Sequence, residues 1–310
     1  MKKIYLISPR GFCAGVTRAI DIVNLALQKY GKPVYVKHEI VHNKFVIDDL
    51  KNKGAIFIEE IDEVPKGMPL VFSAHGVSKA VVSDAEKKST AIIDATCPLV
   101  TKVHVQAMKF DAMGFHIILI GHRHHPEVEG TIGQLSDGKV TLIEDISDVK
   151  NLNFINIKKL AYITQTTLSV DDTKEIISAL KIKFPNIQAS PKEDICYATT
   201  NRQNAIKEYA ALCEAFIVVG SKNSSNSNRL VEVAKNAGCK NSILLENKDY
   251  LDLGLYKNVN KIGVSSGASV PDHLVSEVIN KFKNTYETEV INLDLQKESV
   301  VFNLPKELRE

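Results

Sequence analysis

The order of structural signals in this 310-residue chain repeats three times. Each round carries an amphipathic stretch, a short apolar run, a polar turn, a second amphipathic stretch and further apolar runs, which are patterns typical of helices and strands. Strands that alternate with helices predict mostly parallel sheets, and a long internal period predicts units of one architecture. We therefore expect an α/β protein of three pseudo-repeated modules, at residues 1–97, 98–195 and 196–283. A tail at 284–310, with the apolar run Val300–Phe302, is expected to add an edge strand or to wrap a neighbouring module.

Composition narrows the class of protein. Hydrophobic residues make up 44% of the chain and charged residues 25%, as in ordinary globular proteins. The 39 basic and 37 acidic residues give a net charge of +2, which provides no excess for nucleic acid or an anionic membrane. The apolar run Ile4–Ile7, which follows Lys2 and Lys3, is broken at Ser8 and is too short for a secretory signal. No stretch approaches the ~18 apolar residues of a membrane span. We expect a cytoplasmic protein with no nucleic-acid or membrane partner.

Polar residues concentrate where the predicted strands end. In open α/β sheets, ligands bind outside the carboxyl ends of the strands. Three modules that face one another are therefore expected to gather these residues around one central cavity. The residues concerned are His42, His75, His122–Glu127, Thr164–Thr167, Ser221–Asn228 and Ser265–Ser269.

Three of the five cysteines occupy the same position in the repeat. Cys13, Cys97 and Cys196 each precede the start of a predicted helix, where unpaired amides and the helix dipole favour a thiolate. Cys213 and Cys239 lack that position, and we expect them to be structural. A single free cysteine is as readily a small apolar filler, but three in equivalent positions favour a shared role.

Zinc and an iron-sulfur cluster are the two candidate groups that these thiolates would bind. Structural zinc sites fill four positions and take closely spaced pairs of ligands, whereas these three cysteines stand far apart in the sequence. Three thiolates fit a cubane iron-sulfur cluster in which one iron lacks a protein thiolate, since a cluster that only transfers electrons has four. An open iron is a Lewis acid that can bind a substrate oxygen. The sequence thus predicts an enzyme that works at its cluster.

Glu127 is the best acid/base candidate. It falls in the first turn of a predicted helix, directly after His124, His125 and Pro126. The alternative is that Glu127 only complements the helix dipole and that each histidine is a surface residue or a hydrogen-bonded core residue.

A second group of polar residues resembles an anion site. Ser224, Ser225 and Asn226, together with Ser269, offer hydroxyl, amide and backbone N–H groups near helix starts. The alternative is a solvated loop of capping residues. Neither G-x-G-x-x-G nor a P-loop is present, so a dinucleotide or ATP is not favoured.

The chain resembles the LytB/IspH family of 4-hydroxy-3-methylbut-2-enyl diphosphate reductases, which carry out the last step of the methylerythritol phosphate route to isoprenoids. The resemblance runs essentially from end to end, and its matched blocks stand in order, with no departure at a motif position. The blocks are Pro9–Gly15, Ser73–Gly76, Asp94–Pro98, His125–Thr131, Thr164–Ser169, Cys196–Gln203, Gly220–Arg229 and Gly267–Ser269.

The resemblance implies a trefoil of three α/β modules around one 4Fe-4S cluster held by Cys13, Cys97 and Cys196. It implies reductive removal of the allylic hydroxyl of the substrate, with electrons supplied singly by a ferredoxin or flavodoxin. Glu127 is then the proton donor, and His125 and Thr166 lie near the substrate hydroxyl. The diphosphate is then held by His42, His75, Ser224, Ser225, Asn226 and Ser269. We expect a monomer or a weak homodimer.

Two other functions remain open. A hydratase of the aconitase type also uses three thiolates and an open iron, but it consumes no electrons. A non-enzymatic iron-sulfur sensor would bind nucleic acid, and the near-neutral charge without a basic stripe weighs against it.

Overall fold

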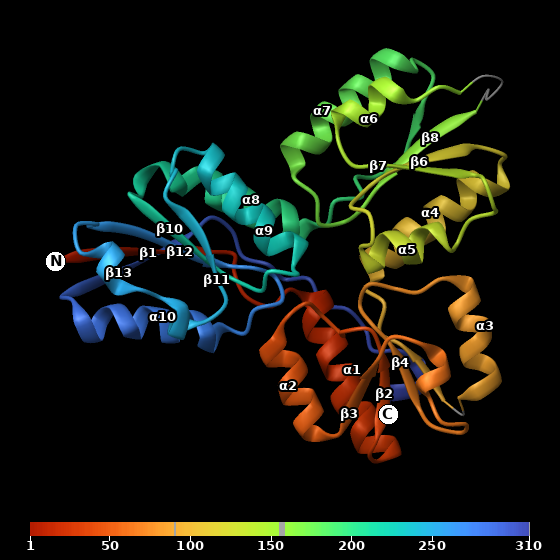
Figure 1. Ribbon diagram of the computed structural model, residues 1–310, viewed down its shortest axis with the longest axis horizontal. Coiled ribbons are helices and arrows are strands. Elements are labelled where there is room, and N and C mark those ends of the chain that lie inside the picture. Colours follow the sequence, from red (N-terminus) through yellow and green to blue (C-terminus); the bar gives the residue numbers. More distant parts are fainter. Residues whose placement is uncertain (90, 155–158, 310) are drawn as a thin grey trace. The chain divides into compact units, whose positions relative to one another are not determined.

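The structure, a computed structural model, describes residues 1–89, 91–154 and 159–309 (Figure 1). Strands and helices alternate along the chain, and the strands form three sheets in which every described pairing is parallel. The expected α/β class with three parallel sheets is confirmed. Short 3-10 helices occur at Ile61–Glu63, Ala210–Leu212, Lys248–Tyr250, Leu253–Tyr256 and Lys306–Leu308.

The first sheet has four strands in the order β3-β2-β4-β5. Its strands are β2 (Val34–Lys37), β3 (Ala55–Ile58), β4 (Leu70–Phe72) and β5 (Ile92–Asp94). The helices in this part of the chain are α1 (Ala14–Tyr30), α2 (Lys44–Lys53) and α3 (Lys79–Lys88).

The second sheet repeats that order as β7-β6-β8-β9. Its strands are β6 (His116–Ile120), β7 (Val140–Ile143), β8 (Leu160–Thr164) and β9 (Gln188–Ala189). The helices in this part of the chain are α4 (Pro98–Ala112), which precedes β6, and α5 (Pro126–Ile132), α6 (Ile146–Asn151) and α7 (Val170–Lys183).

The third sheet has five strands in the order β11-β10-β12-β1-β13. Its strands are β1 (Lys2–Ser8), β10 (Ala215–Val219), β11 (Ser242–Leu245), β12 (Lys261–Ser266) and β13 (Thr288–Asp294). The helices in this part of the chain are α8 (Tyr197–Tyr209), α9 (Ser225–Asn236) and α10 (Asp272–Thr285).

The first strand of the chain joins a different sheet from the one its position in the sequence indicates. The repeat places β1 in a first module at residues 1–97, but β1 pairs with β12 and β13. It thereby takes the place in the third sheet that β5 and β9 take in the other two. Periodicity identifies a strand but not its partner, because strand pairing is a long-range contact. Apart from this strand, the predicted module boundaries stay a prediction.

The chain divides into two compact units. The first consists of Met1–Val16, His42–Val46 and Tyr197–Val301 and contains the five-stranded sheet. The second consists of Thr17–Val41, Ile47–Cys196 and Phe302–Glu310 and contains both four-stranded sheets. Among the described residues, no helix combines the length and the apolar content that crossing a membrane requires.

Apolar side chains alternate along the strands and so supply a core on each face of a sheet. In β1, Ile4 packs with Leu274 and Phe282 of α10, whereas Ile7 packs in a separate cluster with helix residues such as Ile206. Burial of such side chains stabilises the fold by roughly 25 cal/mol per Å² of apolar surface removed from water. Because both faces of this sheet are packed against apolar side chains, a ligand would bind at the polar carboxyl ends of its strands.

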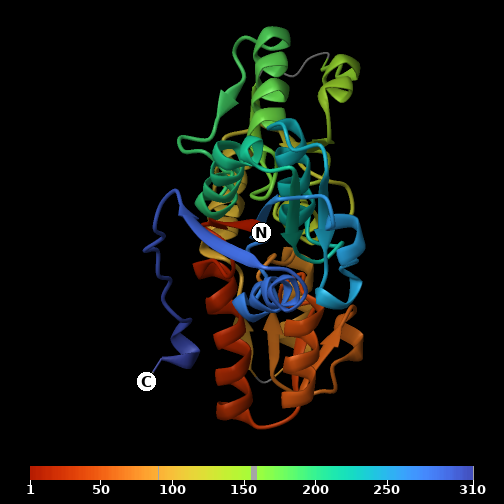
Figure 2. The ribbon, with the colours of Figure 1, turned by 90° about the vertical axis from the view of Figure 1, so that its left-hand side faces the viewer.

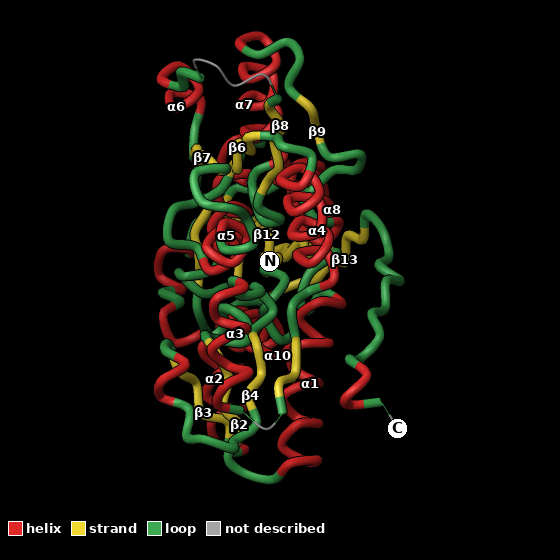
Figure 3. Tube along the Cα trace, turned by 90° about the vertical axis from the view of Figure 1, so that its right-hand side faces the viewer, coloured by secondary structure: helices red, strands yellow, loops and turns green. Residues whose placement is uncertain are grey.

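The C-terminal tail supplies an edge strand, although not from the residues that the sequence indicated. The strand is β13, whereas Val300–Phe302 are not in a strand. The following residues run along α1 (Figures 2 and 3), where Arg18 Nε donates to the carbonyl oxygen of Asn303 at 2.7 Å. Glu310 lies outside the described residues.

Candidate active site

The three cysteines of the repeat lie at equivalent points of the topology. Cys13 directly precedes α1, Cys97 caps α4 and Cys196 directly precedes α8. Each follows the fourth strand of a sheet, which is β1, β5 or β9. Their expected position at helix starts is confirmed. All five cysteines of the chain are described, and none forms a disulfide.

Burial separates these three cysteines from the other two. Cys13, Cys97 and Cys196 are partly exposed, whereas Cys213 and Cys239 are buried. Burial raises the pKa of Cys213 to about 12 and also raises that of Cys239, so both stay thiols at neutral pH. Only the three cysteines at helix starts have the placement that a metal-binding thiolate needs.

Backbone hydrogen bonds tie two of these cysteines to the ends of strands that carry other candidate residues. The Cys97 N–H donates to the carbonyl oxygen of Ala74 at 3.0 Å, next to His75. The Cys196 N–H donates to the carbonyl oxygen of Thr166, also at 3.0 Å. Cys97 is therefore linked to the turn after β4, and Cys196 to the turn after β8.

Glu127 is a buried carboxyl in the first turn of α5, as the sequence predicted. Its side chain accepts from the Thr166 N–H at 2.6 Å and from the Thr166 hydroxyl at 2.8 Å. Burial raises the pKa of Glu127 to about 7; the Thr166 hydrogen bonds lower it, and the nearby Asp194 adds to the rise. The carboxyl can therefore hold or release a proton near neutral pH, as a general acid must.

Two of the candidate histidines meet beside this carboxyl. His125 is the N-cap of α5, and its Nδ1 accepts from the Glu127 N–H at 3.1 Å. The rings of His75 and His125 stand edge to face, with centroids 5.9 Å apart. The His124 side chain, by contrast, is 84% exposed, and its Nδ1 stands 4.0 Å from the Glu129 carboxylate. The second unit thus joins Cys97, His75, His125, Glu127, Thr166 and Cys196 through consecutive contacts.

In the first unit, Ser269 and Cys13 meet at the turn after β12. The Cys13 N–H donates to the carbonyl oxygen of Ala268 at 3.2 Å. The Ser269 hydroxyl donates to the carbonyl oxygen of His42 at 3.1 Å. This turn therefore links Cys13 to two of the predicted diphosphate ligands.

The start of α9 carries the predicted anion-binding residues. Ser224 is its N-cap, and its hydroxyl accepts from the Ser227 N–H at 3.3 Å. The helix begins at Ser225, so Ser225 and Asn226 lie in its first turn. Gly267 allows the turn after β12 to lie against this helix, because a Cβ there would stand 2.1 Å from the Ser227 hydroxyl oxygen.

Asn226 is the polar residue in this region that most strongly indicates a ligand. It is buried, and neither its amide nitrogen nor its amide oxygen has a hydrogen-bond partner among the described residues. An unsatisfied buried amide costs free energy unless something binds it. A polar ligand at the start of α9 would satisfy it.

The predicted ligands fit an iron-sulfur cluster in kind and number. Three partly exposed cysteines at helix starts can provide three thiolates and leave one iron open. Cys13 belongs to the first unit, and Cys97 and Cys196 belong to the second. Convergence of the three on one cluster stays a prediction, as does the central cavity.

Sequence reasoning missed the side chains that support these residues. Asp194 is buried near Glu127, and its carboxylate accepts from the Thr164 N–H at 3.1 Å. Arg202 is fully buried in α8. One signal was available, since Arg202 lies on the same helix face as Ala198, Ala205 and Ile206, which are all buried. A charged residue on an apolar helix face indicates a specific partner.

Comparison with known proteins places the chain in a family. A model of the LytB protein family matches residues 4–283. The 4-hydroxy-3-methylbut-2-enyl diphosphate reductase of Neisseria meningitidis serogroup C (strain 053442) is 55% identical over 308 residues, which cover 99% of this chain and 95% of the relative. The enzyme of the same name from Paracoccus denitrificans (strain Pd 1222) is 52% identical over 307 residues, which cover 99% and 97%.

The fold agrees with these matches. The solved structure of the E-1-hydroxy-2-methyl-but-2-enyl-4-diphosphate reductase from Plasmodium falciparum superposes with a TM-score of 0.95 at 44% identity, covering 99% of this chain and 96% of that one. Because the family match and these relatives span nearly the whole sequence, the chain belongs to the LytB protein family.

Proposed function

We propose that this chain is a 4-hydroxy-3-methylbut-2-enyl diphosphate reductase, which converts that substrate to isopentenyl and dimethylallyl diphosphate. The membership of the LytB family and the names of its relatives support this function. The structural observation that carries it is the buried Glu127 carboxyl, with a pKa of about 7, beside Thr166 and His125. A reductive dehydroxylation needs such a proton donor to release the hydroxyl oxygen as water.

Cys13, Cys97 and Cys196 would hold one 4Fe-4S cluster. When bound, the cluster supplies the electrons and a Lewis-acidic iron for the substrate oxygen. Balance of the reaction requires two electrons and two protons for each C–O bond broken and each water released. We expect a ferredoxin or flavodoxin to deliver the electrons one at a time, and a monomeric or weakly dimeric cytoplasmic enzyme.

Glu127 would deliver the proton that the departing oxygen takes up. The two hydrogen bonds from Thr166 fix the orientation of the carboxyl group, which limits the reorganisation needed when the proton moves. Thr166 and His125 would contact the substrate hydroxyl, because each lies against Glu127.

The diphosphate would bind at the start of α9 and the turn after β12. A helix of this length offers N–H groups and a favourable dipole to an anion at its N-terminus. Ser224, Ser225, Asn226 and Ser269 would add side-chain donors, and His42 and His75 would add imidazole donors. The unsatisfied Asn226 amide supports this assignment.

Replacement of Asn226 by alanine is expected to weaken substrate binding without lowering stability. Loss of a hydrogen bond to a charged group costs about 1.5–3 kcal/mol, or roughly 10- to 150-fold in Kd. The thermal midpoint should stay the same or rise, because the buried amide has no protein partner to lose. Calorimetric titration with a diphosphate product and thermal unfolding measure the two effects.

Asn236→Ala provides the matched control at the exposed end of the same helix. Its affinity and thermal midpoint should equal those of the parent chain. Unchanged affinity in the Asn226 variant would contradict its role in diphosphate binding.

Electron counting tests the proposed function itself. The anaerobically reconstituted chain should consume two reducing equivalents for each substrate molecule converted. Turnover without a reductant would indicate the aconitase type of hydratase instead. A chain that neither converts nor binds the substrate would instead be a non-enzymatic sensor.

A further inference from the structure

The loop that carries Cys13 is held by several hydrogen bonds to its backbone. The Gly11 N–H donates to the Ser266 hydroxyl at 2.9 Å, and the Cys13 N–H donates to the carbonyl oxygen of Ala268 at 3.2 Å. The Ala14 N–H donates to the Tyr197 hydroxyl at 3.3 Å. Gly11 has a φ of +69°, a conformation that glycine adopts without steric cost. The loop is therefore fixed in one conformation from several sides.

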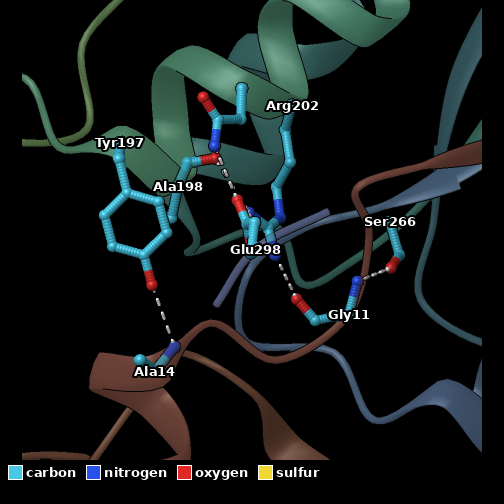
Figure 4. Close-up of polar contacts among 8 residues, drawn as sticks. Gly11, Ala14, Tyr197, Ala198, Arg202, Ser266 and Glu298 are labelled. Atoms are coloured by element: carbon cyan, nitrogen blue, oxygen red, sulfur yellow. Dashed lines mark hydrogen bonds and ion pairs between the residues drawn. The ribbon is translucent and has the colours of Figure 1, made fainter. Parts of the chain in front are cut away.

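A buried arginine supplies the central contact to this loop (Figure 4). Arg202 Nη2 donates to the carbonyl oxygen of Gly11 at 2.8 Å. Its Nη1 donates to the carbonyl oxygen of Ala198 at 2.9 Å within α8. Arg202 is 0% exposed, so its charge has no access to solvent. A buried cation costs free energy unless a counter-charge or hydrogen-bond acceptors compensate it.

Glu298 is that partner. Its carboxylate accepts from Arg202 Nη1, with distances of 3.0 and 3.3 Å to the two oxygens, and from Asn201 Nδ2 at 3.1 Å. Glu298 lies beyond β13 in the C-terminal segment, far from the loop in sequence. The three contacts of Arg202 thus connect the Cys13 loop, α8 and the C-terminal segment within the first unit.

We propose that Arg202, neutralised by Glu298, is a positioning residue that holds the Cys13 loop in the conformation needed to bind the cluster. The inference rests on the proposed function for the identity of the bound group. Arg202 does not touch the reacting atoms in this scheme. It acts by fixing the Gly11 carbonyl, two residues before the ligand cysteine, while Tyr197 fixes the amide one residue after it.

The reactivity of Cys13 in the cluster-free chain tests the proposal without any enzyme assay. Arg202→Gln should raise the rate at which iodoacetamide alkylates Cys13 by about tenfold. The reason is that loss of one buried hydrogen bond raises the population of the open loop by about that factor. Peptide mass spectrometry measures each cysteine separately. Cys97 and Cys196 should keep the rates of the parent chain. An unchanged rate at Cys13 would overturn the proposal.

Lys2→Gln is the matched control. Lys2 is another buried cation of the first unit, and its Nζ donates to the carbonyl oxygens of Tyr256, Lys257 and Val259 at the opposite end of β1. The control should leave the Cys13 rate unchanged. Equal acceleration in Lys2→Gln and Arg202→Gln would assign the effect to general destabilisation and overturn the proposal.

Arg202→Gln could misfold, in which case the buried Cys213 and Cys239 would also become reactive toward iodoacetamide. Two further variants test the proposal in that case. Glu298→Gln keeps the side-chain volume but removes the countercharge, and it should also accelerate alkylation of Cys13. Arg202→Lys keeps the charge and should restore part of the protection. Parent-chain rates in Glu298→Gln would contradict the role of the pair.

Iron release separates this inference from the proposed function. In the reconstituted chain, Arg202→Gln should lose iron to a chelator about tenfold faster than the parent chain, by the same loop opening. Equal release rates would overturn the positioning role while leaving the function intact. If the parent chain takes up no iron, the proposed reductase function is wrong. The alkylation rates, which are measured on the cluster-free chain, would still show whether Arg202 holds the Cys13 loop.

Discussion

Glu127→Gln is expected to lower kcat by about 10²- to 10⁴-fold, the usual contribution of a positioned general acid. Glutamine has nearly the same shape and can still accept from Thr166, so the local fold should be retained. It cannot give up a proton to the departing oxygen. Cluster content and the affinity for a diphosphate product should therefore match those of the parent chain.

Glu129→Gln is the matched control, since Glu129 lies on the same helix with its side chain 58% exposed. It should keep the parent rate. A parent rate in Glu127→Gln would remove this carboxyl from the proton path. Loss of the cluster in Glu127→Gln would indicate instead that the residue is needed for assembly.

The pH dependence of kcat follows from the same carboxyl. Burial raises the pKa of Glu127 to about 7, with Asp194 adding to the rise and Thr166 opposing it. A donor must be protonated, so kcat should be constant well below pH 7 and should fall with rising pH above it, by about tenfold per pH unit at the limit. The residual kcat of Glu127→Gln should not show this fall above pH 7.

Much of this site could be predicted because its residues carry local signals. Helix starts are marked by capping residues and prolines, so the placement of Cys97 and of His125, Pro126 and Glu127 followed from short stretches of sequence. The contact between Glu127 and Thr166 could not be derived in that way. The strand-end pattern placed both stretches near one cavity, but the contact itself depends on two strand ends meeting in one sheet, and only the family resemblance gave the two residues a shared role.

Long-range pairing accounts for the other differences. The pattern of β1 is that of a strand buried on both faces, which is the same for any parallel sheet. Nothing in those residues says that β12 and β13 are its neighbours. Arg202 is a similar case, because its partners Gly11 and Glu298 come from opposite ends of the chain. Its burial could be suspected from helix periodicity, but the identity of its partners could not.

Single replacement of Cys13, Cys97 or Cys196 by alanine is expected to abolish stable cluster binding. Substitution of an outer-shell partner already costs roughly 10- to 100-fold in metal affinity, and removal of one of only three thiolates should cost more. Each variant should contain little iron and sulfide after anaerobic reconstitution, whereas the parent chain should contain four of each per cluster. The cluster content of each variant is measured by iron and sulfide analysis and by the visible absorption of the cluster.

Cys213→Ala separates ligation from stability in this experiment. Cys213 is buried in the core of the first unit and its thiol pKa is raised to about 12, so it is a poor metal ligand. This variant should keep a full cluster, although the cavity left by the sulfur lowers its thermal midpoint. Full cluster content in any of the three ligand variants would exclude that cysteine as a ligand. Loss in Cys213→Ala as well would show that folding, rather than ligation, limits the iron content. A cluster lost only from the three variants at helix starts would mean that the repeated topology itself, which places one cysteine after the fourth strand of each sheet, builds the metal site.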